Sequence, residues 1–383
     1  MDFEALNALK ETISNQTDVA LEITKQLLQT ELKDENMVYS PLSIHILLSM
    51  IAADETGPSL DQFLSVLKSK STNDLNSLAF NLVTAVLADG SASCGPCLNF
   101  ANGLWVREPH SLESSYQQVL CNSYKASIKQ VTMGTSSEEV RTEVNAWVEE
   151  QTRGLIPEIL PPGSANGIRI SANALYFKAT WYDEYFHESE TKEDVFHLLG
   201  GDIVDKVPFM TSSAEHCITA FEGFKALRLP YQASEDYEDC RSFSMWLLLP
   251  GAIDGLPALA HRVCSEPGFI DVHLRSWERV EVGKFLIPKF KISTRFEASD
   301  ILWKLGLTAR SSEMYHQAII EVNEKDTTAA AATVDDMCFA MCEDYRIKKK
   351  EDFVADHPFM FLIKEDRTGT VLFMGHVLNP LGD

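Results

Sequence analysis

Positive charge is scarce in this sequence. Its 383 residues hold 33 Lys plus Arg against 56 Asp plus Glu, a formal net charge of −23. A surface this acidic repels phosphate backbones and anionic lipid, so we expect no nucleic-acid or membrane partner. No run of about 18 apolar residues occurs, which argues against a transmembrane helix. The first residues lack the basic and apolar regions of a signal peptide, so we expect a cytoplasmic or nuclear protein, with leaderless extracellular release left open.

The sequence also lacks the common signatures of catalysis. It contains no Gly-x-Ser-x-Gly, no Gly-x-Gly-x-x-Gly, no phosphate-binding P-loop and no His-Glu-x-x-His. Its ten histidines are isolated from one another and from paired cysteines, so no spacing indicates a metal site. We therefore expect no cofactor, no metal and no enzymatic activity.

Eight cysteines are scattered along the chain without forming a dense framework, which is typical of reduced thiols. Cys94 and Cys97 are separated by Gly-Pro, the spacing of a thioredoxin-type redox pair. That chemistry needs the first cysteine at the start of a helix. Residues 98–106 instead alternate apolar side chains with a period of two, which predicts a strand. A turn before a strand is the favoured interpretation, and a thiol oxidoreductase is the weaker hypothesis.

Helical patterns dominate the first half of the chain and strand patterns the second. The periodicity predicts helices over residues 18–32, 42–53, 59–67, 75–90 and 140–152. Ser40-Pro41 supplies an N-cap and a first-turn proline, and residues 59–62 have the spacing of a capping box. Strands are predicted over residues 168–177, 243–249, 280–292, 318–323, 359–363 and 371–377. This order indicates a single α+β domain with mixed sheets over residues 1–383.

One segment has unusually small side chains. Four alanines flanked by threonines make a poor core, and alone they indicate a surface helix or an alanine-rich loop. Side chains of this size also displace little volume, so such a segment can enter a narrow slot between strands. The segment consists of Glu324, Lys325, Asp326, Thr327, Thr328, Ala329, Ala330, Ala331, Ala332 and Thr333.

This segment resembles the hinge of the reactive-centre loop of serpins. Further matches occur in order at residues 39–44, 144–149, 173–178, 207–210, 353–359 and 371–380. The form of residues 196–199 and 356–359 is most similar to plant serpins. The resemblance implies a single serpin-like domain with about three mixed β-sheets, a helical N-terminal part, and an exposed hinge and reactive-centre loop over residues 324–352.

The resemblance also implies a mechanism. Serpins offer the exposed loop to a protease, which cuts it and forms an acyl-enzyme. The freed part of the loop then inserts into the main sheet and distorts the trapped protease, so strain stored in the fold is released. We accordingly expect a monomer that inhibits serine proteases, preferably elastase- or chymotrypsin-like, and extend the expectation to papain-like cysteine proteases.

Several positions of the family match residues of this chain. Spacing from Glu324 places the reactive bond at Ala340–Met341, with Phe339–Ala340 as second choice and Arg346–Ile347 as third. Trp181 matches the tryptophan where the loop first enters the sheet. A group under the sheet, which controls its opening in serpins, matches Ser40, Ser43, Asn173 and His316. Residues of these types also occur as satisfied buried polar groups, and both roles can hold together.

Other positions depart from the inhibitory pattern. Asp326 stands where inhibitory serpins nearly always have glycine, whose backbone freedom a hinge uses. Thr328 replaces a glutamate, Ala179 replaces a glycine, and residues 307–315 are shorter than in most serpins. Strand alternation places Asp335 on the inward face of an inserted loop, where an unpaired carboxylate is costly. The alternative is therefore a non-inhibitory serpin: a protease substrate, a binding protein or a decayed paralogue.

Overall fold

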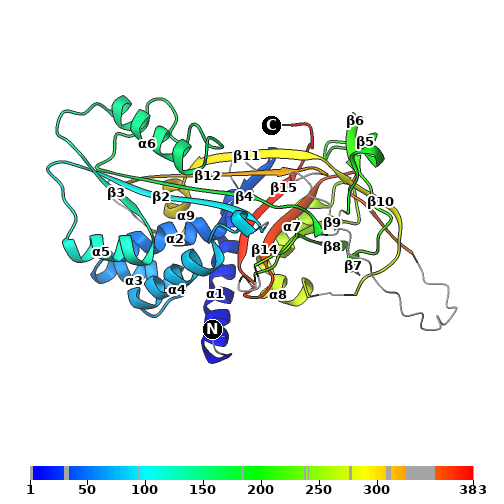
Figure 1. Cartoon of the computed structure of the whole chain (residues 1–383), viewed down its shortest axis with the longest axis horizontal. Coiled ribbons are helices and arrows are strands. Elements are labelled where there is room, and N and C mark those ends of the chain that lie inside the picture. Colours follow the sequence, from blue (N-terminus) through cyan, green and yellow to red (C-terminus); the bar gives the residue numbers. More distant parts are fainter. Residues whose placement is uncertain are drawn as a thin grey trace.

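The α+β class predicted from the sequence is the class of the fold. The computed structural model describes residues 3–29, 34–93, 95–182, 185–236, 239, 241–275, 278–307, 312–324 and 350–382. Within these residues the strands form sheets of six, five and four strands (Figure 1). The five-stranded sheet spans the molecule, and most helices of the N-terminal part lie against one of its faces.

The five predicted helices correspond to α1, α2, α3, α4 and α6 of the described residues, although α1 starts earlier and α4 ends earlier than predicted, and α5, α7, α8 and α9 were not predicted. Helix α2 begins as expected, because the Ser40 side chain accepts from the Ser43 backbone N–H at 3.1 Å and Pro41 occupies the first turn. Helix α3 begins two residues before Ser59, with Thr56 as its N-cap, so the capping box predicted there is wrong. The helices are α1 (Phe3–Leu27), α2 (Pro41–Ala52), α3 (Gly57–Val66), α4 (Thr72–Asn81), α5 (Ser114–Ser123), α6 (Ser137–Gln151), α7 (Leu256–Ser265), α8 (Phe269–His273) and α9 (Ser299–Lys304).

The five-stranded sheet contains the strand predicted after the Gly95-Pro96 turn. Its order is β11 (Phe290–Glu297), β12 (Ser312–Val322), β4 (Arg169–Lys178), β2 (Cys97–Arg107) and β3 (Ser127–Val131). Strand β12 begins six residues before the predicted start and pairs with a neighbour on each side. Strand β12 therefore starts within the short segment 307–315.

The six-stranded sheet forms the second half of the core. Its order is β1 (Met37–Tyr39), β15 (Val371–Val377), β14 (Phe359–Glu365), β9 (Phe243–Pro250), β8 (Phe224–Pro230) and β7 (Cys217–Phe221). Four of these strands, β1, β9, β14 and β15, are buried at every residue. The sequence predicted β9, β14 and β15 as strands, but burial on both faces leaves no alternation that would indicate their partners.

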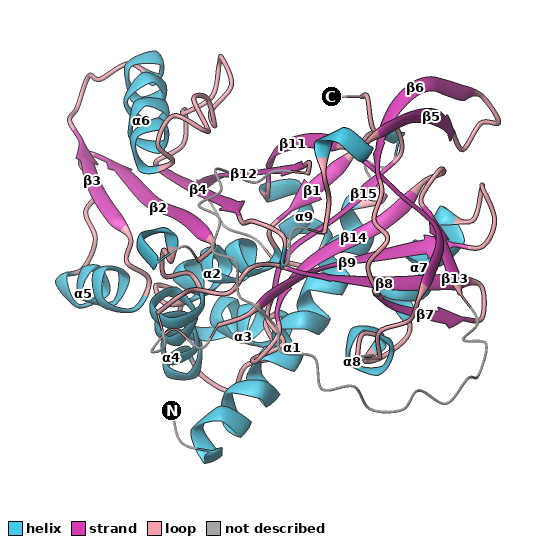
Figure 2. Ribbon diagram, turned by 45° about the vertical axis from the view of Figure 1, so that its right-hand side comes forward, coloured by secondary structure: helices cyan, strands magenta, loops and turns pink. Residues whose placement is uncertain are grey.

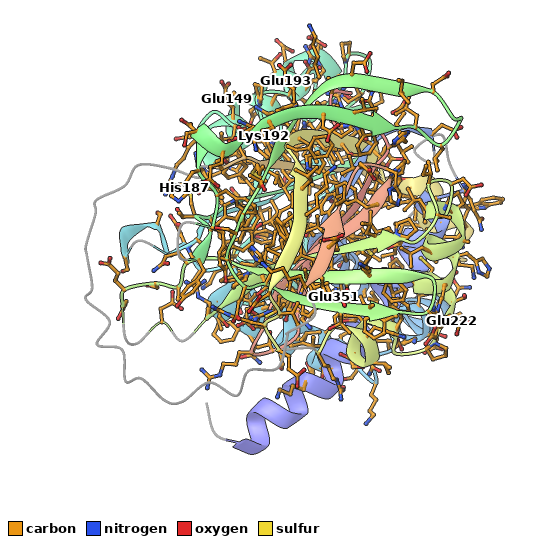
Figure 3. All side chains as sticks on the ribbon, turned by 90° about the vertical axis from the view of Figure 1, so that its right-hand side faces the viewer. Glu149, His187, Lys192, Glu193, Glu222 and Glu351 are labelled. Atoms are coloured by element: carbon orange, nitrogen blue, oxygen red, sulfur yellow. The ribbon has the colours of Figure 1, made fainter. Side chains whose placement is uncertain are left out.

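The four-stranded sheet has the order β13 (Glu351–Val354), β10 (Val282–Pro288), β6 (Ile203–Met210) and β5 (Lys192–His197). The single strand predicted over residues 280–292 is wrong, because β10 ends at Pro288 and β11 starts two residues later in another sheet. Strand β5 is an outer edge of its sheet, and its first residues, Lys192 and Glu193, are exposed there (Figure 3). Exposed charges on an edge strand oppose pairing with a second chain.

Helix α6 covers one face of the five-stranded sheet near β2 and β4, whereas alternate side chains of β11 are exposed on that face (Figure 2). Alternation along β2 divides its side chains between two core clusters: Ala101 and Trp105 pack with helix α6, and Leu104 and Val106 pack with helix α2 on the opposite face. Gly103 faces the α6 side, where a Cβ would lie 2.6 Å from the Trp105 ring. The α2 face of the sheet is thus buried, and the opposite face is covered by α6 only over β2 and β4.

One position requires glycine because the backbone of a neighbouring strand lies too close for a side chain. A Cβ on Gly375 of β15 would overlap the carbonyl oxygen of Met37 and lie 2.7 Å from Cζ of Phe361. Because the nearest obstacle is backbone of the neighbouring strand β1, it cannot turn aside. We expect Gly375→Ala to lower the free energy of unfolding by about 3 kcal/mol, measured by urea denaturation. In Gly251→Ala the nearest atom is 3.6 Å away, so this control should change stability little, and equal losses would contradict the prediction.

Candidate functional site: the seam between two parallel strands

Strands β4 and β12 lie side by side at the centre of the five-stranded sheet and run parallel. Their register extends from Arg169 opposite Ser312 to Tyr176 opposite Ile319. We call this row of contacts the seam, with its lower end at Arg169 and its upper end at Tyr176. Since parallel pairs are slightly less stable per residue than antiparallel ones, the seam is a weak line in the sheet.

Trp181 closes the upper end of the seam. Its Nε1–H donates to the carbonyl oxygen of Asn323 at 2.8 Å, which fastens the chain leaving β4 to the chain leaving β12. Its ring stacks on Tyr231 with centroids 4.6 Å apart. The cavity beside these rings, which Ala179 also lines, measures about 10 Å³, room for a single water. A strand can therefore enter here only if these contacts separate.

Glu324, the first residue of the predicted hinge, is anchored to two other segments. Its carboxylate lies 2.6 Å from Nζ of Lys289, in the turn between β10 and β11, and accepts from the Thr191 hydroxyl. Burial opposes ionisation of Glu324, but the hydrogen bonds from Lys289 and Thr191 outweigh it and hold the pKa of this carboxyl below its usual range. The anchor fixes where the chain leaves β12.

The four polar residues predicted to lie under the sheet are brought together below the middle of the seam. The Ser40 backbone N–H donates to Nε2 of His316 at 3.1 Å, so Nδ1 carries the ring proton and donates to Oδ1 of Asn173 at 3.3 Å. His316 and Asn173 are opposite each other in the register, and Ser43 lies in the first turn of α2. All four residues are fully buried.

Burial keeps this group uncharged. It lowers the pKa of His316 to about 3, so the imidazole is neutral at physiological pH. A neutral group can be rearranged without moving an isolated charge through the core, which would be costly. The seam is therefore held at its centre by directional hydrogen bonds.

The chain that carries this seam is similar to proteins of known family. A family model described as Serpin (serine protease inhibitor) matches residues 14–380. Serpin-ZX of Arabidopsis thaliana is 44% identical, over 97% of this chain and 99% of the relative. The chain belongs to the serpin family. The structure of Arabidopsis AtSerpin1 in its native stressed conformation is similar to the present one with a TM-score of 0.88 at 41% identity, covering 100% of this chain and 99% of that chain.

The predicted resemblance to serpins, and to plant serpins among them, is confirmed. Not every similar relative is described as an inhibitor: the Arabidopsis protein named probable non-inhibitory serpin-Z5 is 42% identical over 97% of this chain and 84% of its own length. Serpins are generally protease inhibitors, and this chain is a serpin. Whether this serpin inhibits a protease therefore depends on the residues of its reactive-centre loop.

Those loop residues lie outside the described part of the chain. This applies to the hinge from Lys325 to Thr333 and to all three candidates for the reactive bond, so these stay predictions. Cys94 of the possible redox pair also lies outside it. Its partner Cys97 has a raised pKa, chiefly through burial, which is the opposite of what an attacking thiolate needs.

The described residues contain neither a metal-binding cluster nor a membrane-spanning helix. No group of three or more His, Cys, Asp and Glu side chains is arranged to hold a metal ion. None of the described helices combines the length and apolar character needed to cross a membrane.

Sequence reasoning missed several residues that act on the seam. Tyr231, Lys289 and Thr191 come from segments far from β4 and β12 in the sequence, and none belongs to a local motif. Lys289 follows the proline that ends β10, and that break could have indicated a turn there. The contacts themselves depend on how three sheets meet.

Low pH should weaken the serpin through its buried histidines. His316 takes up a proton in the unfolded chain below about pH 6.5 but in the native chain only near pH 3, so the stability is present above pH 6.5 and is lost as pH falls. Within this window, each such histidine lowers the free energy of unfolding by roughly 1 kcal/mol for every unit by which the pH falls. His45, His216 and His376, whose pKa values are lowered to about 4, act in the same direction.

We expect the free energy of unfolding in urea to fall between about pH 7 and pH 5 and the fall to be shallower in His316→Gln. His110 is exposed, so His110→Gln is the control and should keep the wild-type slope. Equal slopes in all three proteins would show that His316 does not titrate as described.

Proposed function

We propose that this serpin inhibits serine endopeptidases as a suicide substrate, by loop cleavage, acyl-enzyme trapping and strand insertion. The observation that supports this most strongly is the parallel seam itself. A strand inserted between β4 and β12 from its upper end would run antiparallel to both, replacing one parallel pair by two antiparallel pairs. The insertion therefore has a thermodynamic driving force within the sheet.

The length of the loop suits the seam. Residues 325–340 comprise 16 residues up to the preferred reactive bond, and β12 comprises 11. The cleaved segment is therefore long enough to extend along the whole of β12. The small side chains of Thr327, Ala329, Ala331 and Thr333 suit the inward face of the sheet, which packs on helix α2.

The residues around the bond support elastase- or chymotrypsin-like targets. Cleavage after Ala340 or Phe339 leaves the protease close to the inserting segment. Cleavage after Arg346 would add six residues, or roughly 20 Å of extended chain, between the protease and the inserted strand. That slack weakens the pull that distorts the protease, so a trypsin-like target ranks third. Papain-like cysteine proteases belong to the same proposal, because they also form an acyl-enzyme.

A non-inhibitory role is the second candidate. Asp326 lacks the conformational freedom of glycine at the hinge, and Asp335 would place a carboxylate on the buried face of an inserted strand. Both features slow or weaken insertion, and a slow insertion lets the protease complete the cleavage. The similarity to a relative named probable non-inhibitory serpin-Z5 also supports this second candidate.

The decisive test mixes the protein with elastase-, chymotrypsin-, trypsin- and papain-like proteases. We expect a denaturant-resistant band at the summed mass, and mass spectrometry of the released peptide should place the cut at Ala340–Met341. Loop-cleaved protein should unfold at a markedly higher temperature than intact protein, because insertion releases the stored strain. Cleavage without the band in every mixture, and without heat stabilisation, would favour the non-inhibitory role.

Three variants make this test specific. Thr327→Arg places a charge on the inward face and should abolish the band while cleavage continues, whereas Thr328→Arg, on the opposite face, should retain it. Asp326→Gly restores a flexible hinge and should increase the fraction of trapped protease. If only Asp326→Gly traps protease, the native chain is a substrate, and Asp326 is the reason.

A further inference from the structure

The lower end of the seam is closed by a carboxylate. Glu313, the second residue of β12, accepts hydrogen bonds from three consecutive backbone N–H groups: Ala165 to Oε2 at 2.8 Å, and Asn166 and Gly167 to Oε1 at 2.7 and 2.6 Å. The Tyr315 hydroxyl also donates to Oε2 at 2.9 Å. Hydrogen bonds to an ionised acceptor are stronger than the neutral bonds of the sheet ladder.

These contacts cross the seam. The three amides belong to the connection between α6 and β4 and directly precede the first residues of β4, whereas Glu313 belongs to β12 and pairs in register with Ile170. The amides converge because Ala165 is left-handed, with φ of 62°, and its carbonyl oxygen accepts from Nη2 of Arg107 at 2.7 Å. Successive N–H groups arranged in this way form an anion-binding nest.

An inserted strand cannot coexist with these bonds. Neighbouring strands are about 4.8 Å apart, so a strand between β4 and β12 would move them to roughly twice that distance. We propose that Glu313 is a latch that must release before an inserting loop fills the lower end of the seam. It therefore limits how fast insertion is completed. This inference rests on the proposed function. It also gives the shortened segment 307–315 a role, because Glu313 lies within it.

Hydrogen exchange tests the latch directly. In the intact protein the amides of residues 165–167 should be protected, and in loop-cleaved protein they should exchange at least tenfold faster. Glu313→Gln should remove this protection in the intact protein and increase the rate of insertion at least tenfold, measured by stopped-flow tryptophan fluorescence with excess protease. Glu321→Gln is the matched control, since Glu321 lies on the same strand but pairs with Lys291 of β11, away from the seam.

The outcomes separate the latch from the proposed function. The latch alone would be overturned by two results in cleaved protein that is heat-stabilised. The amides of residues 165–167 would stay protected, and Glu313→Gln would insert its loop at the wild-type rate. Cleaved protein that is not heat-stabilised would overturn insertion and the latch together. Faster insertion in Glu313→Gln but not in Glu321→Gln supports the latch even if Glu313→Gln also lowers the stability of the intact protein.

A second inference comes from a separate cavity of about 340 Å³, which lies between the ends of α1, α7 and β15. This volume is within the range of small-molecule sites. Apolar side chains make up most of its wall: Leu28, Leu199, Leu256, Pro257, Ala260 and Leu378. The cavity lies away from the seam, and nothing in the trapping mechanism uses it.

The polar groups of this cavity favour an uncharged ligand. His376 is 2% exposed, and its Nε2–H donates to the carbonyl oxygen of Glu35 at 2.8 Å, which leaves Nδ1 as an acceptor. Burial lowers the pKa of His376 to about 4 and raises that of the Cys264 thiol to about 12, so both are neutral. The wall also carries one cation, Lys25, and one anion, Asp34, so these two formal charges cancel. Helix α1 ends at the cavity, and a helix C-terminus disfavours anions.

We infer that this cavity binds a small uncharged apolar molecule with one hydroxyl or N–H group that donates to His376. The probe is N-phenyl-1-naphthylamine, a neutral apolar fluorophore with one N–H. We expect saturable binding by the intact protein and at least tenfold weaker binding by Ala260→Trp, which fills the cavity. Ala258→Trp on the exposed side of α7 is the control and should bind like wild type.

Competition tests the role of His376. 1-Naphthol should displace the probe at a concentration at least tenfold lower than naphthalene, and His376→Phe should abolish this difference. Absence of saturable binding, equal binding by the two tryptophan variants, or equal displacement by 1-naphthol and naphthalene would each overturn the inference. Protease trapping should be unchanged in Ala260→Trp.

Discussion

The parallel pairing of β4 and β12 is the interaction on which the rest of this structure depends. The two strands are more than a hundred residues apart in the sequence, yet eight consecutive residue pairs join them in the five-stranded sheet. Their side chains belong to two core clusters, so the pairing cannot shift without disturbing both. Other contacts around the sheet either hold this pair together or fix the chain that leaves it.

Three different kinds of contact hold the seam at its upper end, its centre and its lower end. At the upper end Trp181 uses ring stacking and a single N–H bond. At the centre His316 uses neutral hydrogen bonds to the first turn of α2 and to the opposite strand. At the lower end Glu313 uses an ionised carboxylate on a nest of backbone amides. The lower contact is the strongest of the three and the last that a strand from the upper end would reach.

The increase in contact strength from the upper to the lower end of the seam fits a metastable fold whose sheet opens from the upper end. Under the proposed function, the closed sheet of five strands persists because its contacts must separate before a sixth strand can enter, which is a kinetic form of stability. The scaffold of this serpin has the seam and its contacts in place. Whether protease is trapped or released then depends on the loop, through Asp326 at the hinge and Asp335 on the face that would be buried.

Much of the local structure followed from the sequence. The Ser40-Pro41 cap and the strand after the Gly95-Pro96 turn depend on local side-chain preference and period, and both are present in the structure. Helices and strands are more interleaved than predicted, because β2 and β3 precede α6 and helices α7, α8 and α9 lie among the later strands. The order of motifs also identified the serpin family, and with it the residues under the sheet. The capping box at Ser59 failed because Gly57 and Pro58 already start that helix.

Tertiary structure alone decided which strands became neighbours. A period of two indicates a strand but not its partner, so the sequence could not place β12 beside β4 or divide residues 280–292 between two sheets. The proton position on His316, the partners of Glu324 and the amides bound by Glu313 depend on segments that meet only in the folded chain. Local pattern determined the elements of this serpin, and long-range packing determined the seam, because pairing across a sheet is a property of two segments rather than of either one.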